Sequence, residues 1–217
     1  MSPSADDEMR LLPGPEAKEL AELHLLHHDL DHAVKAIRLL VDAFGEREFT
    51  EAEQIMRLGL YRDAVVQFVA CFDGSAPLFL QVADIYSDDA NASSSFHCLK
   101  TLRDTFAAHR NGPARQCAVG VIPGPTGPRG TGHLKMVLHV PDSNQLKLTH
   151  DFISKARQHV LQRLEKLDQQ LRAAAMAMSR EEILALPSAS TRNANPKEMR
   201  LSRERFGRTF RPSSAPK

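Results

Sequence analysis

Two long stretches of the chain place mostly apolar side chains at steps of three, four or seven residues, and this spacing constrains the fold most. In residues 16–43 the positions are Leu20, Leu23, His27, Leu30, Val34, Ile37 and Val41. In residues 143–178 they are Ile153, Val160, Leu164, Leu167, Leu171, Ala174 and Met178. Side chains at these spacings share one face of an α-helix. The sequence therefore predicts two long amphipathic helices that must pack on other helices or on a second copy of the chain.

Shorter helices are marked by local signals at their ends. Thr50 and Glu53 have the spacing of a capping box, which predicts a helix that begins at Thr50 and closes near Gly74. The apolar face of this helix is expected at Ile55, Leu58, Tyr61 or Arg62, Val65 and Val69. Three further helices are expected, over residues 77–86, over residues 94–109 and after the cap Ser179.

A short β-hairpin is expected before the last long helix. Residues 117–122 are an apolar run, and apolar side chains alternate with others in residues 133–140, which is typical of strands. Between them, residues 123–132 are rich in Gly and Pro and predict a flexible tip, without the Gly-Lys-Ser/Thr end of a phosphate-binding loop. Aromatic residues make up only 6% of the chain and Trp is absent, which disfavours a β-sandwich or barrel. The expected fold class is all-α, a bundle of four to five helices with a small hairpin insertion at about residues 117–140.

Composition and charge divide the chain into three segments. Residues 1–15 are expected to be a flexible leader, residues 16–186 the helical domain, and residues 187–217 a disordered Arg-rich tail. The tail holds eight Lys or Arg and two Glu, whereas the rest of the chain holds 20 basic and 25 acidic residues. This asymmetry points to an anionic partner for the tail, and a solvated tail without a partner is the simpler alternative.

Composition also excludes several classes of protein. No apolar run approaches the ~20 residues that cross a bilayer, and the acidic, polar start is unlike a secretory signal. Three cysteines without Cys-x-x-Cys spacing exclude a disulfide scaffold and a four-cysteine zinc site. Cys71 and Cys98 fall in apolar helices and are expected to be buried, inert thiols. A cytoplasmic protein without a membrane partner fits these features best.

The candidate site lies where the expected helix 94–109 ends. Arg103, Asp104 and His109 occur there, followed directly by Arg110 and Asn111. His109 follows Arg103 by six positions, which leaves their side chains about 120° apart around a regular helix. The two converge if His109 lies on an unwinding last turn, or if the same pair of a second copy meets them across a two-fold axis. The alternative is a structural helix end, at which Arg and His side chains cap the last carbonyls.

The segment Leu-Arg-Asp-x-x-x-Ala-His-Arg-Asn, from Leu102 to Asn111, resembles the signature of the HEPN superfamily, in which Arg and a polar residue are followed a few residues later by His. More narrowly, the chain is similar to HEPN proteins of bacterial abortive-infection and toxin–antitoxin systems, over about residues 16–180. The resemblance implies a metal-independent endoribonuclease that needs no cofactor and leaves a 2′,3′-cyclic phosphate. The partners that it implies are RNA, a second copy in a homodimer and a cognate antitoxin protein.

The resemblance also implies a role for each residue of the segment. His109 would act as general base or acid, because the ordinary pKa of histidine lies near neutral pH. Arg103 would supply a bidentate positive fork to the transition state of phosphate transfer. Asp104 would orient the His or the Arg, and Arg110 and Asn111 would bind a backbone phosphate.

Two other functions stay open. The first is a non-catalytic helical module that binds a partner protein or nucleic acid. The second is a metal site on one face of the first long helix, made by three histidines at four-residue spacing, His24, His28 and His32. No Glu-x-x-His segment elsewhere completes a ligand set, so we expect no metal. Instead His27 should fill its place in the apolar stripe, with the other histidines exposed or paired with Asp29 and Asp31.

Overall fold

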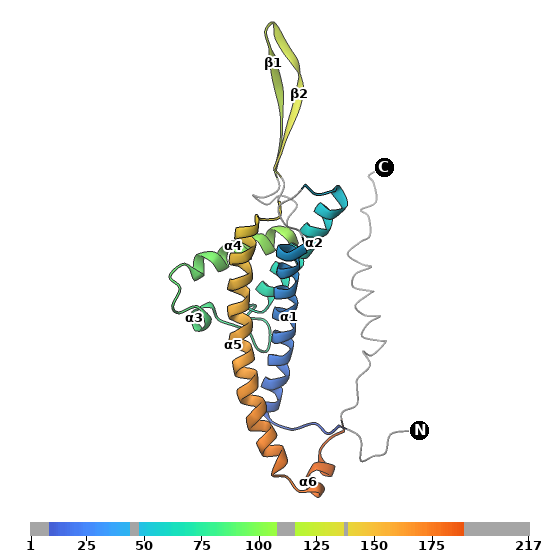
Figure 1. Ribbon diagram of the computed structural model, residues 1–217, viewed down its shortest axis with the longest axis vertical. Coiled ribbons are helices and arrows are strands. Elements are labelled where there is room, and N and C mark those ends of the chain that lie inside the picture. The colour runs from blue at the N-terminus through green and yellow to red at the C-terminus, as the bar shows by residue number, and fades with distance from the viewer. Residues whose placement is uncertain (1–8, 44–47, 108–115, 137–138, 189–217) are drawn as a thin grey trace, which may run out of the picture. The chain divides into compact units, whose positions relative to one another are not determined.

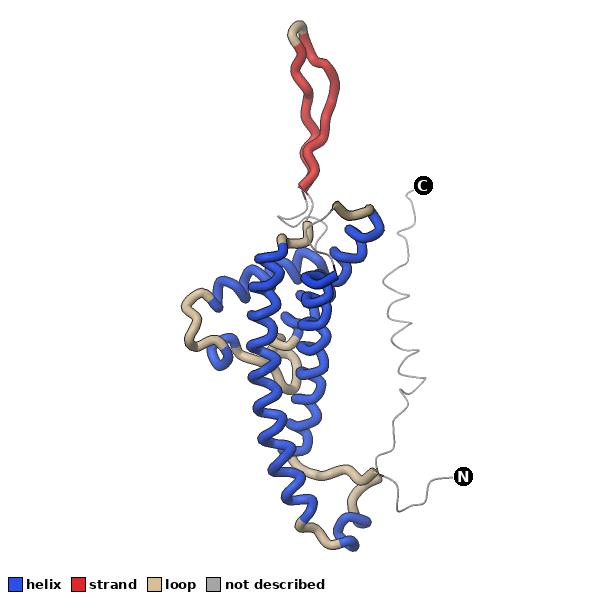
Figure 2. The backbone as a smooth tube through the Cα atoms, viewed as in Figure 1, coloured by secondary structure: helices blue, strands red, loops and turns tan. Residues whose placement is uncertain are grey.

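The computed structural model describes residues 9–43, 48–107, 116–136 and 139–188. These residues form six helices and one antiparallel pair of strands (Figure 1). In chain order the elements are α1 (Pro15–Ala43), α2 (Glu51–Ala70), α3 (Val82–Ile85), α4 (Ala92–Ala107), β1 (Gln116–Gly124), β2 (Gly127–Met136), α5 (Ser143–Met176) and α6 (Arg180–Ala185). Helix dominates the described backbone (Figure 2), so the expected helical class with a small hairpin is confirmed. The expected disorder of the basic tail falls on residues 189–217, outside the described residues.

Two helices begin at the capping boxes that the sequence indicates. At α2 the Glu53 amide donates to the Thr50 hydroxyl at 3.3 Å, and the Thr50 amide donates to the Glu53 carboxylate at 2.9 Å. At α6 the Glu182 amide donates to Ser179 at 3.2 Å, and the Ser179 amide donates back at 2.7 Å. Each box satisfies amides that the first turn of a helix leaves without intrahelical partners.

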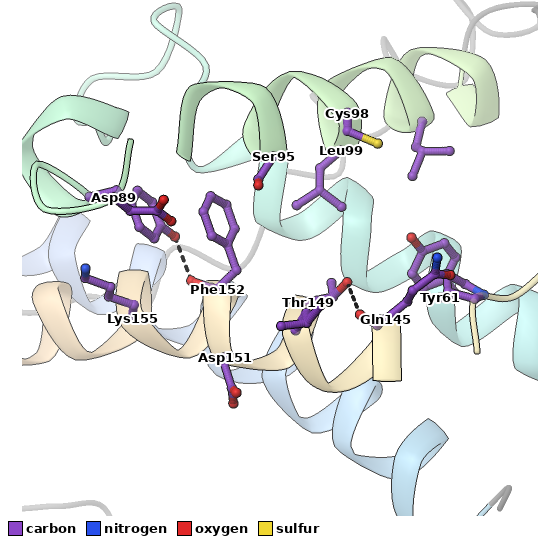
Figure 3. Close-up of a pocket in the computed structure, with 14 residues that line it drawn as sticks. Tyr61, Asp89, Ser95, Cys98, Leu99, Gln145, Thr149, Asp151, Phe152 and Lys155 are labelled. Carbon is purple, nitrogen blue, oxygen red and sulfur yellow. Dashed lines mark hydrogen bonds between the residues drawn. The ribbon is translucent and has the colours of Figure 1, made fainter. Parts of the chain in front are cut away.

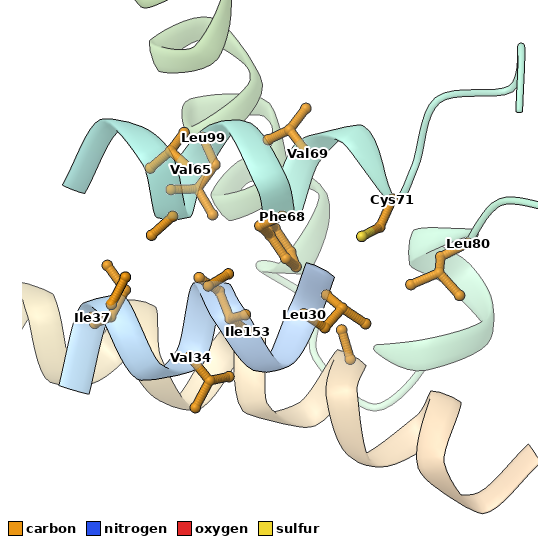
Figure 4. Packing of buried hydrophobic residues seen from close by; sticks show 14 of the residues in the cluster. Leu30, Val34, Ile37, Val65, Phe68, Val69, Cys71, Leu80, Leu99 and Ile153 are labelled. Carbon is orange, nitrogen blue, oxygen red and sulfur yellow. The ribbon is translucent and has the colours of Figure 1, made fainter. Parts of the chain in front are cut away.

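Side chains of α1, α2 and α5 meet in one apolar core (Figure 4). On α1 the predicted stripe is buried at Leu23, Leu30, Val34 and Ile37, whereas His27 is half-buried. On α5 the stripe is fully buried at Ile153 and Val160, half-buried at Leu164 and Leu167, and exposed at Ala174. The core contact of α5 therefore belongs to its first part.

An aromatic cluster joins the helices at the centre of this core. Phe68 of α2 is fully buried, and its ring packs edge-on against three others, with centroid distances of 5.1 Å to Phe72, 6.2 Å to Phe96 and 5.8 Å to Phe152. The Phe152 ring of α5 also stacks on Tyr86 at 4.1 Å, and the Tyr86 hydroxyl donates to the Phe152 carbonyl at 2.7 Å. These contacts fix α4 and α5 against α2, and the segment after α3 against α5.

Ion pairs tie α1 to α5, which lie side by side in Figures 1 and 2. Arg157 donates to Asp31 at 3.2 Å, and Arg163 donates to Glu19 at 2.9 Å. Asp31 also lies 2.6 Å from Lys35 of its own helix. The two long helices are thus held together by polar contacts at the rim of the apolar core.

The apolar face of α2 differs from the one expected. Ile55 is 67% exposed, and burial begins only at Tyr61. From there the buried positions are Tyr61, Ala64, Val65, Phe68 and Val69. The prediction was wrong for the first turns because apolar side chains occur on several faces of this helix, and only its second half lies against the other helices.

Within residues 77–86, where one helix was expected, only α3 is helical, and the residues before it belong to no helix or strand. Leu80 is buried and donates its amide to the Cys71 carbonyl at 2.8 Å, while Phe79 and Gln81 on either side are exposed. Inward and outward side chains therefore alternate with a period of two, which is the pattern of extended backbone. The following helix α4 also begins two residues earlier than expected, at Ala92.

The hairpin is confirmed, but its strands run almost to the tip. Gln116 pairs with Met136, and the pairing continues to Gly124 with Gly127, which leaves a turn of Pro125 and Thr126. Gly127 has a φ of +152°, and a Cβ at Gly124 would lie 2.9 Å from the Gly127 carbonyl. Glycine at both positions permits this tight turn, so the tip is two residues long, and most of the stretch 123–132 belongs to the strands instead. The second strand ends at Met136 rather than at Val140.

Backbone contacts divide the chain into two compact units. Gly14–Ala174 forms one, and the described residues on either side of it, 9–13 and 175–188, belong to the other. Within the second unit the Leu11 amide donates to the Pro187 carbonyl at 2.8 Å, next to a bridge between Arg10 and Ser188. None of the described helices combines the length and apolar composition that a bilayer crossing requires.

Candidate functional site

Arg103 and Asp104 lie in the last two turns of α4, where the sequence places the candidate site. The Arg103 Nε lies 2.7 Å from the Asp104 Oδ1, and the two side chains are 27% and 47% exposed. The Nε is itself buried, yet it makes no hydrogen bond in the described structure. The N–H does not point at the carboxylate oxygen, so the contact is an ion pair without a hydrogen bond.

The guanidinium of Arg103 has no other ion-pair partner and no hydrogen bond to a carbonyl within the described ranges. An arginine that served only to cap α4 would donate to the last carbonyls of the helix. A partly enclosed guanidinium with unused donors is instead suited to receive an anion, since buried donors are costly when they stay unpaired.

The other residues of the candidate site are not placed. His109, Arg110 and Asn111 lie outside the described residues, so the approach of the His109 imidazole to Arg103 remains a prediction. The same holds for the contact of two such pairs across a two-fold axis. Of the five residues that the sequence singles out, the structure brings together Arg103 and Asp104.

The histidines of α1 are arranged mainly toward solvent. His24 and His28 are exposed, and His32 lies 2.8 Å from Asp63 of α2, rather than pairing with Asp29 or Asp31. In the part of the chain that the structure describes, no three His, Cys, Asp or Glu side chains are grouped closely enough to hold a metal ion.

His27 differs from the other histidines because it is half-buried. Burial is the main cause that lowers the pKa of His27, and the nearby Asp31 carboxylate partly opposes it. The neutral imidazole is therefore favoured at this position, which fits its place in the stripe of α1.

A cavity of about 690 Å³ lies between α2, α4 and the first half of α5 (Figure 3). Its walls are mainly aromatic and aliphatic, with Tyr61, Tyr86, Phe152, Leu99, Leu102 and Leu148. Burial raises the pKa of Tyr61 to about 12, so its hydroxyl is neutral at physiological pH. Lys155 at the wall is paired with Asp88. The cavity thus offers room for an apolar group, and no nucleophile paired with a base lines it.

Arg103 does not line this cavity, although its neighbour Leu102 does. Around the helix Arg103 is about 100° from Leu102 but only about 40° from Leu99, so it lies at the edge of the α4 face that lines the cavity. No sequence signal pointed to the cavity, because three segments distant in the chain form it.

The two described cysteines differ in environment. Cys71 is buried, donates its thiol to the Gln67 carbonyl at 3.3 Å, and has its pKa raised to about 12, mainly by burial. Cys98 is exposed and lines the cavity, so the expectation that it is buried was wrong. It comes one position before the buried Leu99, which lines the same cavity.

Comparison of the chain with protein-family models, with curated proteins and with solved structures gives no match. The HEPN resemblance therefore rests on the residues of the Leu102–Asn111 segment and on the helical fold.

Proposed function

We propose that this chain is a metal-independent endoribonuclease of HEPN type, in which Arg103 and His109 carry the catalysis. The observation that carries the proposal is the state of Arg103. Its side chain is largely enclosed at the end of α4, and among the described residues it is paired only with its sequence neighbour Asp104. No hydrogen bond to another described residue occupies its Nη donors, which leaves them for a phosphate.

The reaction follows from the chemistry of these groups. His109 removes the proton of a ribose 2′-hydroxyl, whose oxygen then attacks the adjacent phosphorus. The bond from phosphorus to the 5′-oxygen of the next nucleotide breaks, and that oxygen takes up a proton. One product ends in a 2′,3′-cyclic phosphate, and the other begins with a 5′-hydroxyl. No metal ion enters this balance.

Arg103 stabilises the negative charge that grows on the phosphate oxygens in the transition state. The Asp104 carboxylate lies beside its Nε, so the Nη atoms stay available for two parallel hydrogen bonds to the phosphate. Arg110 and Asn111 bind the neighbouring backbone in this proposal. A homodimer is part of the proposal. His109 of a second copy could reach Arg103 even though the two side chains of one copy are about 120° apart around the helix.

The biological setting proposed is abortive infection or a toxin–antitoxin system in the cytoplasm, with an antitoxin protein that restrains cleavage. This part of the proposal is supported by the resemblance alone.

The experiment is cleavage of a labelled RNA by the full chain in excess EDTA. Arg103→Ala and His109→Ala should each reduce the rate by at least about a hundredfold, within the range for the loss of a catalytic donor or base. Arg103→Lys should recover little, because lysine lacks the planar fork. Arg38→Ala and His28→Ala, both exposed on α1, are matched controls and should leave cleavage unchanged.

The products and the folded state decide the remaining outcomes. Mass analysis should find the cyclic phosphate, and circular dichroism should find the same helix content in every variant. Cleavage that survives both substitutions, or that stops in EDTA, would contradict the mechanism. Folded protein that cleaves no RNA would favour the non-catalytic helical module.

A further inference from the structure

The hairpin Gln116–Met136 differs from the helices in charge. It contains Arg129 and Lys135 and no Asp or Glu, and the acid-free stretch extends from Asp104 to Asp142. The chain as a whole holds 27 acidic residues among 217, so a stretch of this length would ordinarily contain several. The hairpin is therefore a basic segment of a chain whose helices carry the acids, and it is complementary to an anionic partner.

A bulge next to the tip places Arg129. Ile122 pairs with Gly130 and Pro123 pairs with Pro128, so Arg129 is the extra residue of the second strand. The extra residue of a bulge leaves the ladder, and its side chain is re-aimed. Arg129 is exposed and has no ion pair within the described ranges. Its charge is thus presented beside the turn, free of any carboxylate.

One face of the hairpin adds apolar side chains to this charge. Val119 and Val121 are 77% and 65% exposed, and the register places Thr131 opposite Val121 on the same face. At the turn, Pro123, Pro125 and Pro128 contribute apolar rings and no amide donors. The strands pair only with each other in the described sheet, so this face and the tip have no partner there.

We infer that the hairpin is an RNA-binding arm, in which Arg129 and Lys135 hold backbone phosphates while the valines and the proline tip contact sugars and bases. The RNA bound by the arm would be the RNA that the ribonuclease cuts, so this inference rests on the proposed function. Proteins bind single strands with positive charges that follow the backbone, and proline is among the apolar side chains that insert between bases of nucleic acids. A second copy of the hairpin would carry the same positive charge, so a polyanion is the better partner.

The test measures RNA affinity in a chain that does not cleave. The His109→Ala chain, otherwise complete, is titrated into a fluorescent single-stranded RNA at several salt concentrations, and anisotropy gives the Kd. The test variant adds Arg129→Ala and Lys135→Ala. The matched control instead adds Lys166→Ala and Arg172→Ala, which also remove one lysine and one arginine, both exposed on α5.

Counterion release sets the expected size of the effect. Each phosphate contact to a single strand contributes about 0.7 to the slope of log affinity against log salt, which amounts to about fivefold in affinity at 0.1 M salt. Loss of both contacts should therefore weaken binding by about 25-fold and lower the slope by about 1.4. The basic tail is present in every variant, so its own contribution cancels.

Each outcome bears on the arm separately from the catalysis. Equal affinity of the test and control variants overturns the arm, even where the unmodified chain cleaves RNA. Weakened binding in the test variant supports the arm, even where the unmodified chain cleaves nothing and the proposed function fails. A change of oligomeric state by light scattering, with unchanged RNA affinity, also overturns it and assigns the hairpin to a contact between copies.

Discussion

The thiol of Cys71 makes the folded chain sensitive to alkali, and the size of this effect follows from its surroundings. Burial raises the pKa of Cys71 from 9.0 to about 12, and the charge of Asp29 adds to the rise. The thiol also donates to the Gln67 carbonyl, and a thiolate could not. A group whose pKa is higher in the folded state stabilises the fold below its unfolded pKa, and this contribution is lost as the pH rises.

The loss should begin near pH 9 and continue toward pH 12. Between pH 8 and pH 10 the unfolded thiol ionises and the folded thiol does not, which lowers the free energy of unfolding by about 1.4 kcal/mol. Tyr61 has its pKa raised from 10.0 to about 12 and adds about 0.4 kcal/mol over the same interval. Cys71 is therefore the larger of these two contributions.

Urea unfolding at pH 8 and pH 10, followed by helix circular dichroism in the presence of a reductant, measures this loss. Cys71→Ala should reduce the difference between the two pH values by about 1.4 kcal/mol, whatever it does to stability at pH 8. The matched control is Cys98→Ala, which removes an exposed thiol and should keep the pH dependence of the unmodified chain. Equal losses in the unmodified and Cys71→Ala chains would refute the buried, hydrogen-bonded thiol.

Three further predictions concern single contacts of the fold. Thr50→Ala removes the cap of α2 and should cost about 1 kcal/mol in urea unfolding, whereas Thr50→Asp should recover most of it. Tyr86→Phe keeps the ring on Phe152 but removes the 2.7 Å hydrogen bond, and should also cost about 1 kcal/mol by the same assay; no loss would mean that the hydroxyl is solvated instead. The pKa of Asp31 is lowered, first by its hydrogen bond with Lys35, so the carboxylate stabilises the fold above pH 4 and this contribution is lost as the pH falls. Asp31→Asn should flatten that part of the acid unfolding curve. An unchanged curve would contradict the pairing.

The parts of the fold that follow from the sequence are those set by local or periodic signals. The stripe of α1 places Leu23, Leu30 and Ile37 on one face without reference to the rest of the chain. The capping box at Thr50 needs only the four residues that form it. The hairpin follows from alternating side chains on either side of glycine and proline. In each case the residues that decide the structure are neighbours in sequence.

Where the local pattern fits more than one structure, packing determines which residues are buried, and predictions from the sequence were wrong. Apolar residues occur around α2, and only contact with the other helices selects Phe68 over Ile55. The run Leu78-Phe79-Leu80 is apolar throughout, so the sequence shows no alternation, and only packing selects Leu80 for burial and leaves Phe79 exposed. Cys98 is exposed because it lines the open cavity, and only the packing of the neighbouring helices leaves this space beside it.

The candidate site also combines residues that the sequence locates with features that only packing determines. The sequence locates Arg103 and Asp104 at the end of a helix, and the structure adds that, among the described residues, the guanidinium pairs only with Asp104. The cavity follows only from the packing of α2, α4 and α5 and is lined by Leu99, one helical turn from Arg103. Leu99 is buried, so substitutions of Leu99 should lower stability, whereas substitutions of Arg103 should lower cleavage. Because the two side chains are neighbours on the helix, their effects should couple rather than add.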